Sequence, residues 1–430
     1  MDPVLQVALD FDNLSRAMKL AREAVAGGAD WIEAGTPLIK SEGLDAVRAL
    51  RKEFPSHTII ADMKTLDAGR FEMEMAAKAG ADVAVVMSAA SEATIRECGE
   101  AGRNYGIKVA VDILNSEYPV DAAKLAEDCG VHHVGVHLPI DDQMRGRNPF
   151  TLISDVRKAV GIPVAVAAGL NSETVVDAIK AGADILIIGG AITKSENAKQ
   201  ATEIIKKAMT SLEAVPTELY KRASGENVRE ILEKVSTPNI SDGAHRMPGL
   251  VGVQPVTPGK KIVGKAVTVH TCPGDWAKPV EAIDEAESGD VIVVDGGGLP
   301  LVVWGGLATN SAVQRGLAGA VIYGGVRDIG EIQEAGFPVF ASHIAPNAGE
   351  PRGLGEIGVP IRIGGILIQP GDWIVGDDNG VLVLPKDRAV EMANRAMDRL
   401  EVENRILGEI KSGNSTLSKV MELLRWEKRK

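Results

Sequence analysis

Residues 59–69 read IIADMKTLDAG, an apolar run that ends in a lysine and two carboxylates. Asp62 and Lys64 stand two residues apart, so in an extended strand their side chains leave on the same side. A buried strand with such an end is typical of parallel α/β proteins, in which functional side chains gather where the strands finish. This stretch therefore predicts a strand that opens into a site.

Similar apolar runs recur through the first 210 residues, separated by longer segments whose apolar residues repeat at three and four. Three of these segments end alike, as GGAD at 27–30 and AGAD at 79–82 and 181–184, which indicates glycine helix caps before the next strand. The pattern predicts eight parallel strands with intervening helices, a (β/α)₈ TIM barrel. The runs are LQVALD, WIEAG, TIIADMK, VAVVMSA, KVAVDIL, HVGVHL, PVAVAAG and ILIIGG.

Composition sets the class of protein. A chain of 430 residues exceeds one usual core, so two domains are expected. With 47 basic and 59 acidic residues, the net charge of −12 disfavours a general nucleic-acid surface. Cys98, Cys129 and Cys272 are odd in number and far apart, which fits neither disulfides nor a metal site and indicates packing residues in a reducing cytoplasm.

The N-terminus, MDPVLQVALDFDN, lacks the basic and apolar regions of a signal peptide. The longest apolar stretch, residues 291–308, contains Asp295, Pro300 and several glycines, so it indicates strands and turns and no membrane span. We expect a cytoplasmic protein that binds no membrane.

The predicted strand ends carry polar residues or glycines almost without exception. One such end would mean little, because loops are polar, but the whole set indicates a site. Glu33 and Asp62 come from neighbouring strands and can share Mg²⁺, beside which a protonated Lys64 would stabilise an enolate oxygen. Glycines after strands seven and eight offer backbone N–H groups to a phosphate. The layout predicts a phosphorylated sugar that is enolised at its other end. The strand ends are Asp10, Glu33, Asp62 with Lys64, Asp112, His137, Gly169, and Gly189 with Gly190.

Several of these segments together resemble the 3-hexulose-6-phosphate synthases, members of the orotidine-monophosphate decarboxylase superfamily. The resemblance covers the whole first half and implies a carbon–carbon lyase. Such an enzyme joins formaldehyde to ribulose 5-phosphate with Mg²⁺ or Mn²⁺, or runs the cleavage, and it is dimeric. The matching segments are ALD at 8–10, EAGTPLIKSEG at 33–43, ADMKTLDAG at 61–69, VHLPIDDQ at 136–143 and IIGGAIT at 187–193.

The resemblance also implies roles for single residues. Two departures stand beside them: Ala168–Gly169 replaces a glycine pair, and GGAIT lacks the arginine of the sister keto-gulonate-phosphate decarboxylases. The second departure favours the aldolase, and a keto-sugar-phosphate decarboxylase is the alternative. The implied roles are Glu33 and Asp62 as metal ligands, Lys64 as enediolate stabiliser, His137 as proton carrier, Asp10 as ligand of substrate hydroxyls, and Asp67 as a residue that reaches the partner's site.

The pattern changes after residue 210. The segment VPTELYKRASGENV carries Pro216 and Gly225 and interrupts the repeat, so we place a boundary near 211–217 and domains at 1–212 and 218–430. Beyond it, the strand–helix alternation disappears, and the sequence becomes rich in predicted β-strands and in glycine. This predicts an α/β/α domain of the swivelling type, closed by a long amphipathic helix from about Asp387.

The second half resembles the 4-hydroxy-4-methyl-2-oxoglutarate aldolases and the related regulators of ribonuclease activity. The resemblance rests on STPNISDG at 236–243, GDVIVVDGGG at 289–298 and GGVRDIGEI at 324–332, with twenty residues between Gly306 and Arg327. It implies either a metal-dependent 2-oxo-acid aldolase or decarboxylase, or a non-catalytic binding or assembly module through which the oligomer would grow.

The chemistry of this second motif is consistent with a 2-oxo acid. Asp328 can hold Mg²⁺, and Arg327 presents a guanidinium to the oxo-acid group. The amides of Gly306 and Leu307 would take the carboxylate, and Glu331 would order metal-bound water. A local ion pair between Arg327 and Asp328 is the plainer alternative. Some aldolases carry aspartate where this chain has Gly306, which affects the proton-transfer step.

Two histidine-containing segments predict little. His132 and His133 precede the sixth strand and are expected to be surface or core residues. His270 and Cys272 have no second pair of ligands, so zinc is not expected.

Overall fold

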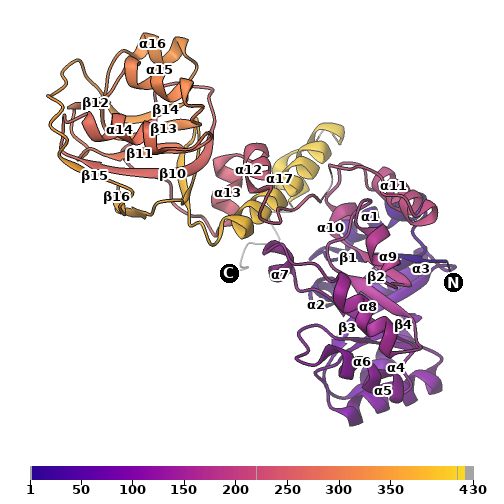
Figure 1. Cartoon of the computed structure of the whole chain (residues 1–430). Helices are drawn as coiled ribbons and strands as arrows, with labels where there is room; N and C mark the ends of the chain where they lie inside the picture. Colours follow the sequence, from indigo (N-terminus) through magenta and orange to yellow (C-terminus); the bar gives the residue numbers. More distant parts are fainter. Residues whose placement is uncertain (1, 219, 414, 422–430) are drawn as a thin grey trace, which may run out of the picture. The chain divides into compact units, whose positions relative to one another are not determined.

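The computed structural model describes residues 2–218, 220–413 and 415–421. It contains two compact units (Figure 1). The prediction that 1–212 and 218–430 are separate domains stays a prediction. The compact units consist of Met1–Gln143, Arg147–Lys221 and Glu401–Lys430 for the first, and of Met144–Gly146 and Arg222–Leu400 for the second.

The first unit is a closed barrel in which each strand pairs in parallel with the next and β8 pairs with β1. The predicted TIM barrel is thus confirmed. Its strands are β1 Val4–Leu9, β2 Trp31–Ala34, β3 Thr58–Thr65, β4 Val83–Met87, β5 Lys108–Asp112, β6 His133–His137, β7 Val164–Ala167 and β8 Ile185–Ile188.

Alternation along the strands explains why this barrel is hollow at one end. In β1, Leu5, Val7 and Leu9 are fully buried in the core shared with the helices. Gln6 and Ala8 alternate with them and line the interior cavity. Small residues recur at interior positions of other strands, so side chains do not fill the barrel interior completely.

Helices connect the barrel strands. The predicted glycine caps are confirmed, because Gly28, Gly80 and Gly182 have φ values of 96°, 95° and 108°, which favour glycine. Asn13, Ser91 and Asn197 cap three helix N-termini through their side chains. The helices are α1 Leu14–Ala26, α2 Thr36–Glu42, α3 Asp45–Glu53, α4 Gly69–Ala79, α5 Glu92–Tyr105, α6 Pro119–Asp128, α7 Ile140–Met144, α8 Phe150–Ala159, α9 Val175–Lys180, α10 Gly190–Thr193 and α11 Ala198–Ser211.

The second unit is built on one large sheet with the order β19-β18-β10-β11-β13-β14-β9. β12 adds to β13 and β15 to β10, and β16 pairs with β17 in a separate hairpin. Two apolar clusters occupy the two faces of the sheet, so β11 and β13 are buried on both sides. The strands are β9 Gln254–Pro255, β10 Ile262–Thr271, β11 Val291–Asp295, β12 Val302–Trp304, β13 Gly319–Val326, β14 Val339–Ile344, β15 Gly355–Ile357, β16 Ile361–Ile363, β17 Ile366–Ile368, β18 Trp373–Asp377 and β19 Gly380–Leu384.

The expectation that strand–helix alternation disappears in the second half is wrong. β10, β11, β13 and β14 run parallel, and α14, α15 and α16 lie between them in the chain. These helices have only six to nine residues, too short to show a clear helical period. The helices of this half are α12 Val228–Lys234, α13 Thr237–Gly243, α14 Ala277–Glu285, α15 Gly306–Gln314, α16 Ile329–Glu334, α17 Ala389–Ser412 and α18 Leu417–Val420.

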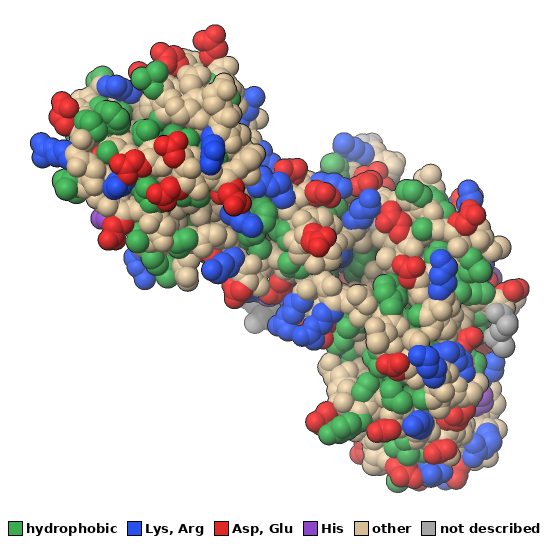
Figure 2. Space-filling model, viewed as in Figure 1, with side chains coloured by type: hydrophobic (Ala, Val, Ile, Leu, Met, Phe, Trp, Pro, Cys, Tyr) green, Lys and Arg blue, Asp and Glu red, His purple; other side chains and the backbone are tan. Residues whose placement is uncertain are grey.

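The cysteines and the surface complete the description. Cys98 and Cys129 are buried, as packing residues should be, but Cys272 is exposed because it lies in the turn after β10. Acidic and basic side chains are interspersed over the visible face of both units (Figure 2). Within the described residues, no helix combines the length and apolar character needed to cross a bilayer.

Candidate active site

A cavity of about 820 Å³ opens where the barrel strands end. All nine residues predicted at the strand ends of the first half line it, and their roles stay a prediction. Asp67 is not among the lining residues. The predicted residues in the lining are Asp10, Glu33, Asp62, Lys64, Asp112, His137, Gly169, Gly189 and Gly190.

Lys64 lies at the centre of a charged cluster. Its Nζ is 3.0 Å from an oxygen of Asp62 and 3.0 Å from Oδ2 of Asp112. Nδ1 of His137 is 2.9 Å from the same Asp112 oxygen. Burial would lower the pKa of Lys64, but Asp62 and Asp112 outweigh it and raise the pKa, so the ammonium stays protonated.

Asp112 joins this lysine to the histidine. Burial would raise the pKa of Asp112, but the hydrogen bond and charge of His137, together with Lys64, hold that pKa below its ordinary value. Its other oxygen accepts the N–H of Leu114 at 2.8 Å. A carboxylate so fixed orients the imidazole, as a proton carrier requires.

The backbone that presents Lys64 is irregular. Lys64 has a φ of 45°, and the β3–β4 register shifts between Ala61 and Thr65. Asp62 and Lys64 do face the cavity together, but a distorted strand end places them there, and not the simple alternation expected from the sequence. A non-glycine residue held in this region costs about 1–3 kcal/mol, a strain that gathers at functional sites.

Glu33 and Asp62 form the carboxylate side of the site. Glu33 is buried and accepts a hydrogen bond of 2.5 Å from Nε2 of Gln6. Thr36 donates to Oδ2 of Asp62 at 2.7 Å. Burial, together with the charges of Asp62 and Asp10, raises the pKa of Glu33 well above its ordinary value. Burial and the charge of Asp62 also raise the pKa of Asp10.

This donor set fits a hard divalent cation. The carboxyl pKa values are raised first by burial and second by the neighbouring negative charges, and such an ion would offset both effects. Among the described residues, no group of three or more His, Cys, Asp or Glu is arranged to hold a metal. Mg²⁺ is commonly bound by one or two carboxylates, with water and substrate as further ligands. The role of Glu33 and Asp62 as such ligands stays a prediction.

Glycines line the cavity where β7 and β8 end. Gly169 has a φ of 66°, which explains why glycine follows β7. Gly189 and Gly190 follow β8, at the start of the short helix α10. Lys194 and Tyr220 line the same end.

Asp67 lies outside the cavity of its own barrel. It is exposed, and its carboxylate accepts the N–H of Ala68 at 2.7 Å. The neighbouring side chains of Leu66 and Phe71 are 57% and 63% exposed. Two large apolar side chains close to this aspartate in sequence are thus open to solvent.

The residues predicted as a site in the second unit also gather. Arg327 Nε lies 3.6 Å from Asp328 Oδ2, and the same oxygen accepts the N–H of Gly306 at 3.1 Å. Glu331 packs against Gly306 in the space that a side chain at position 306 would need. Leu307 is 84% exposed. The ion pair expected as the plainer alternative is present, and it forms part of a larger cluster.

Comparison with known proteins gives matches for both halves. Residues 3–205 match the family described as orotidine 5'-phosphate decarboxylase / HUMPS. The chain is 34% identical over 206 residues to 3-hexulose-6-phosphate synthase of Bacillus subtilis. These aligned residues cover 47% of this chain and 98% of that protein. The chain belongs to this family.

Two further relatives match the same half. An uncharacterized protein of Methanocaldococcus jannaschii is 39% identical over 186 residues, 43% of this chain and 88% of that protein. The bifunctional enzyme Fae/Hps of Methanoregula boonei is 40% identical over 205 residues, 47% of this chain and 51% of that protein. Residues 237–383 match a different family, described as Aldolase/RraA.

Sequence reasoning missed several residues of the decarboxylase-family barrel. His133 was expected at the surface or in the core ahead of the sixth strand, but it belongs to β6, is buried and lines the cavity. A polar residue inside an apolar strand, as in LQVAL, was the available signal for Gln6. For Lys194 the available signal was its position directly after GGAIT, which follows the eighth strand. Tyr220 lies beyond the predicted end of the barrel, and no sequence signal pointed to it.

Proposed function

We propose that the barrel catalyses the reversible aldol addition of formaldehyde to D-ribulose 5-phosphate, which gives 3-hexulose 6-phosphate. The observation that carries this proposal is the position of Lys64, paired with Asp62 and Asp112 while His137 contacts Asp112. This arrangement suits formation of an enediolate at the mouth of a barrel. The family membership and the named synthases among the relatives support it.

The proposed reaction uses the cluster in two steps. A proton leaves C1 of the ketose to His137, and the ammonium of Lys64 stabilises the enediolate oxygens. The C1 carbon then attacks formaldehyde, a carbon–carbon bond forms, and the formaldehyde oxygen takes up a proton. Asp10 binds substrate hydroxyls, and backbone N–H groups near Gly169, Gly189 and Gly190 hold the phosphate.

Glu33 and Asp62 would hold Mg²⁺ or Mn²⁺ in this scheme. A divalent cation there would draw electrons from the substrate carbonyl and favour loss of the C1 proton. Lys64 lies beside the same carboxylate of Asp62, so the protein's own cation would share the stabilisation of the negative oxygen.

The experiment measures consumption of ribulose 5-phosphate by the full chain with and without formaldehyde. Excess EDTA should abolish the formaldehyde-dependent rate, and Mg²⁺ or Mn²⁺ should restore it. Full activity in EDTA contradicts the metal assignment, whereas absence of any formaldehyde dependence contradicts the reaction. Release of CO₂ from a keto-hexulonate phosphate would favour the sister decarboxylase instead.

We further propose that the second unit carries a metal-dependent 2-oxo-acid lyase site. The match of residues 237–383 to the Aldolase/RraA family and the cluster of Arg327, Asp328, Gly306 and Glu331 support this proposal. Arg327 would bind the oxo-acid group, Asp328 a cation, and the amide of Leu307 the carboxylate. The amide of Gly306, expected to share that carboxylate, donates to Asp328 instead.

Arg327→Ala should separate the two sites. We expect loss of any 2-oxo-acid lyase activity by at least about a hundredfold, since a charged ligand of the substrate is removed. The formaldehyde-dependent rate should stay within about twofold, because Arg327 belongs to the other compact unit. A lyase rate that survives both Arg327→Ala and Asp328→Ala would show that the cluster is not a catalytic site.

A further inference from the structure

The chain that leaves the barrel after α11 returns to the mouth of the barrel. Val215 and Ser172 exchange two hydrogen bonds: the N–H of Val215 donates to the Ser172 carbonyl at 3.1 Å, and the Ser172 hydroxyl donates to the Val215 carbonyl at 2.8 Å. The N–H of Thr217 donates to Glu173 at 2.9 Å. The segment 215–217 therefore runs along the loop that follows β7, although it lies beyond the expected end of the barrel domain.

This segment delivers Tyr220 to the cavity. The side chain is 7% exposed, and its ring lies against both Gly169 and Gly190, where any side chain on either residue would collide with it. A Cβ atom on Gly169 would be 2.7 Å from Cε1 of the tyrosine. The Tyr220 hydroxyl donates a long hydrogen bond of 3.4 Å to Oε1 of Gln143.

The polarity of the cavity differs between its two ends. Glu33 and Asp62 make one side acidic, and a phosphate dianion would be repelled there. Asp10 lies nearer the glycines, because a Cβ atom on Gly189 would be 3.8 Å from its Oδ2. At the end lined by glycines, the ammonium of Lys194 lies 5.9 Å from the centre of the Tyr220 ring, and the tyrosine hydroxyl is a donor. A phosphorylated sugar would therefore enter with its phosphate toward Tyr220.

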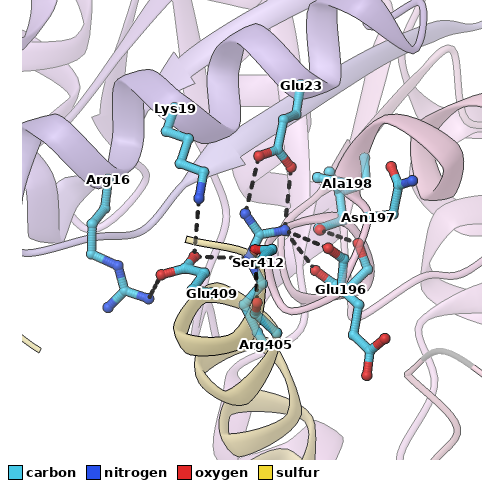
Figure 3. A network of polar contacts seen from close by, with 12 residues as sticks. Arg16, Lys19, Glu23, Glu196, Asn197, Ala198, Arg405, Glu409 and Ser412 are labelled. Atoms are coloured by element: carbon cyan, nitrogen blue, oxygen red, sulfur yellow. Dashed lines mark hydrogen bonds and ion pairs between the residues drawn. The ribbon is translucent and has the colours of Figure 1, made fainter. Parts of the chain in front are cut away.

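The last helix of the chain holds this end of the site. The N–H of Tyr220 donates to Oε1 of Glu401 at 3.0 Å. One turn further along α17, Arg405 donates to both oxygens of Glu23 and to the carbonyls of Ser195 and Glu196, directly after Lys194 (Figure 3). Tyr220, near the start of the second half of the sequence, and α17, near its end, thus both contribute to the barrel.

We propose that Tyr220 is a substrate-positioning residue of the barrel site, which forms the wall of its phosphate end and donates its hydroxyl to the phosphate of the sugar. The inference rests on the proposed function and adds to it a ligand from outside the barrel repeat. The ring fixes the position of the hydroxyl by packing on two glycines, and Glu401 fixes the backbone that carries the ring.

The test compares Tyr220→Phe and Tyr220→Ala with Tyr118→Phe in the full chain. Tyr118 is also a barrel tyrosine, but it is 65% exposed and outside the cavity lining, so its variant is a matched control. KM for ribulose 5-phosphate and kcat are measured at saturating formaldehyde. The Kd for inorganic phosphate is measured by calorimetry.

Tyr220→Phe should raise KM and the phosphate Kd about tenfold, because a hydrogen bond to a charged group is lost, with kcat within about twofold. Tyr220→Ala should raise both further, since the wall is lost as well. A lower KM in Tyr220→Ala would show that the ring obstructs the phosphate and would overturn the proposal, as would an unchanged KM in both variants.

Two features keep the test decisive. Tyr220→Phe retains the ring and its packing, so it carries the test if the alanine variant does not fold. If the wild-type chain shows no formaldehyde-dependent activity, the proposed function fails, yet the phosphate Kd of wild type and Tyr220→Phe still decides the role of Tyr220. Equal Kd values would overturn it.

Discussion

Two residues that line the barrel cavity, Lys64 and His133, differ in their charge state. Lys64 is held charged by two carboxylates, whereas His133 is buried without such help, and burial lowers its pKa to about 4. Both side chains line one cavity. A neutral imidazole thus lies in the same pocket as a protonated lysine, and the physical cause is the location of each group relative to water and to carboxylates.

His133 should make the barrel sensitive to acid. The unfolded chain takes up a proton near the ordinary pKa of 6.5, but the folded chain does so only near 4. The stability that this histidine contributes is therefore present above pH 6.5 and is lost as the pH falls toward 4. Between pH 7 and pH 5 the loss amounts to about 2 kcal/mol.

His133→Asn should remove that part of the acid dependence. The measurement is urea unfolding of wild type and variant at pH 7 and pH 5. His245→Asn, at an exposed side chain, serves as the control and should follow the wild type. Equal acid destabilisation in His133→Asn and wild type would contradict the assignment.

At the scale of elements, α17 divides between the two compact units at Glu401. Its last turns belong with the barrel through Arg405, whose side chain is 6% exposed. The guanidinium spans Glu23 on α1, Glu409 one turn further along its own helix, and two carbonyls after α10 (Figure 3). A planar group with five donors suits this set of partners, and lysine could not replace it.

Arg405→Leu should loosen residues 401–412 from the barrel. The substitution removes several charge-assisted hydrogen bonds and leaves Glu23 without this partner. We expect the amides of residues 401–412 to exchange faster by about ten- to a hundredfold. Hydrogen exchange with mass spectrometry makes the measurement. Arg96→Leu, which breaks an exposed pair with Glu92, is the control and should change little. Unchanged exchange in residues 401–412 would mean that apolar packing alone holds the helix.

At the scale of the whole molecule, the barrel presents Asp67 to its surroundings instead of to its own cavity. The carboxylate is exposed, and so are the large apolar side chains of Leu66 and Phe71, which lie within four residues of it in sequence. We propose a two-fold dimer in which each Asp67 completes the partner's site, as the family resemblance implies.

A mixture of Asp67→Ala and Lys64→Ala chains tests this arrangement. Each variant alone should be nearly inactive. In a mixed dimer, one site carries both defects and the other is wild type, so random pairing should restore roughly a quarter of the activity. Mass spectrometry of differently tagged chains confirms that mixed dimers form. Mixed dimers without activity would assign Asp67 to its own subunit.

Much of the barrel and its site could be predicted from local sequence. Short apolar runs indicate strands, helical repeats indicate helices, and polar residues at strand ends indicate the mouth, because parallel strands finish on one side of a barrel. Asp10, Glu33, Asp62, Lys64 and His137 all follow from this logic. In the second half, three helices of six to nine residues carry too little periodicity, and the alternation was missed.

The sequence by itself determined the repeat, the strand ends and the residue types that gather there, because each is encoded within a few neighbouring positions. Only the tertiary structure decided that Tyr220 and Arg405 belong with the barrel and that His133 faces its cavity. Tyr220 meets Gly169 across 51 residues, and Arg405 meets Glu23 across 382. Contacts over such separations depend on how folded surfaces fit, and no local pattern records them.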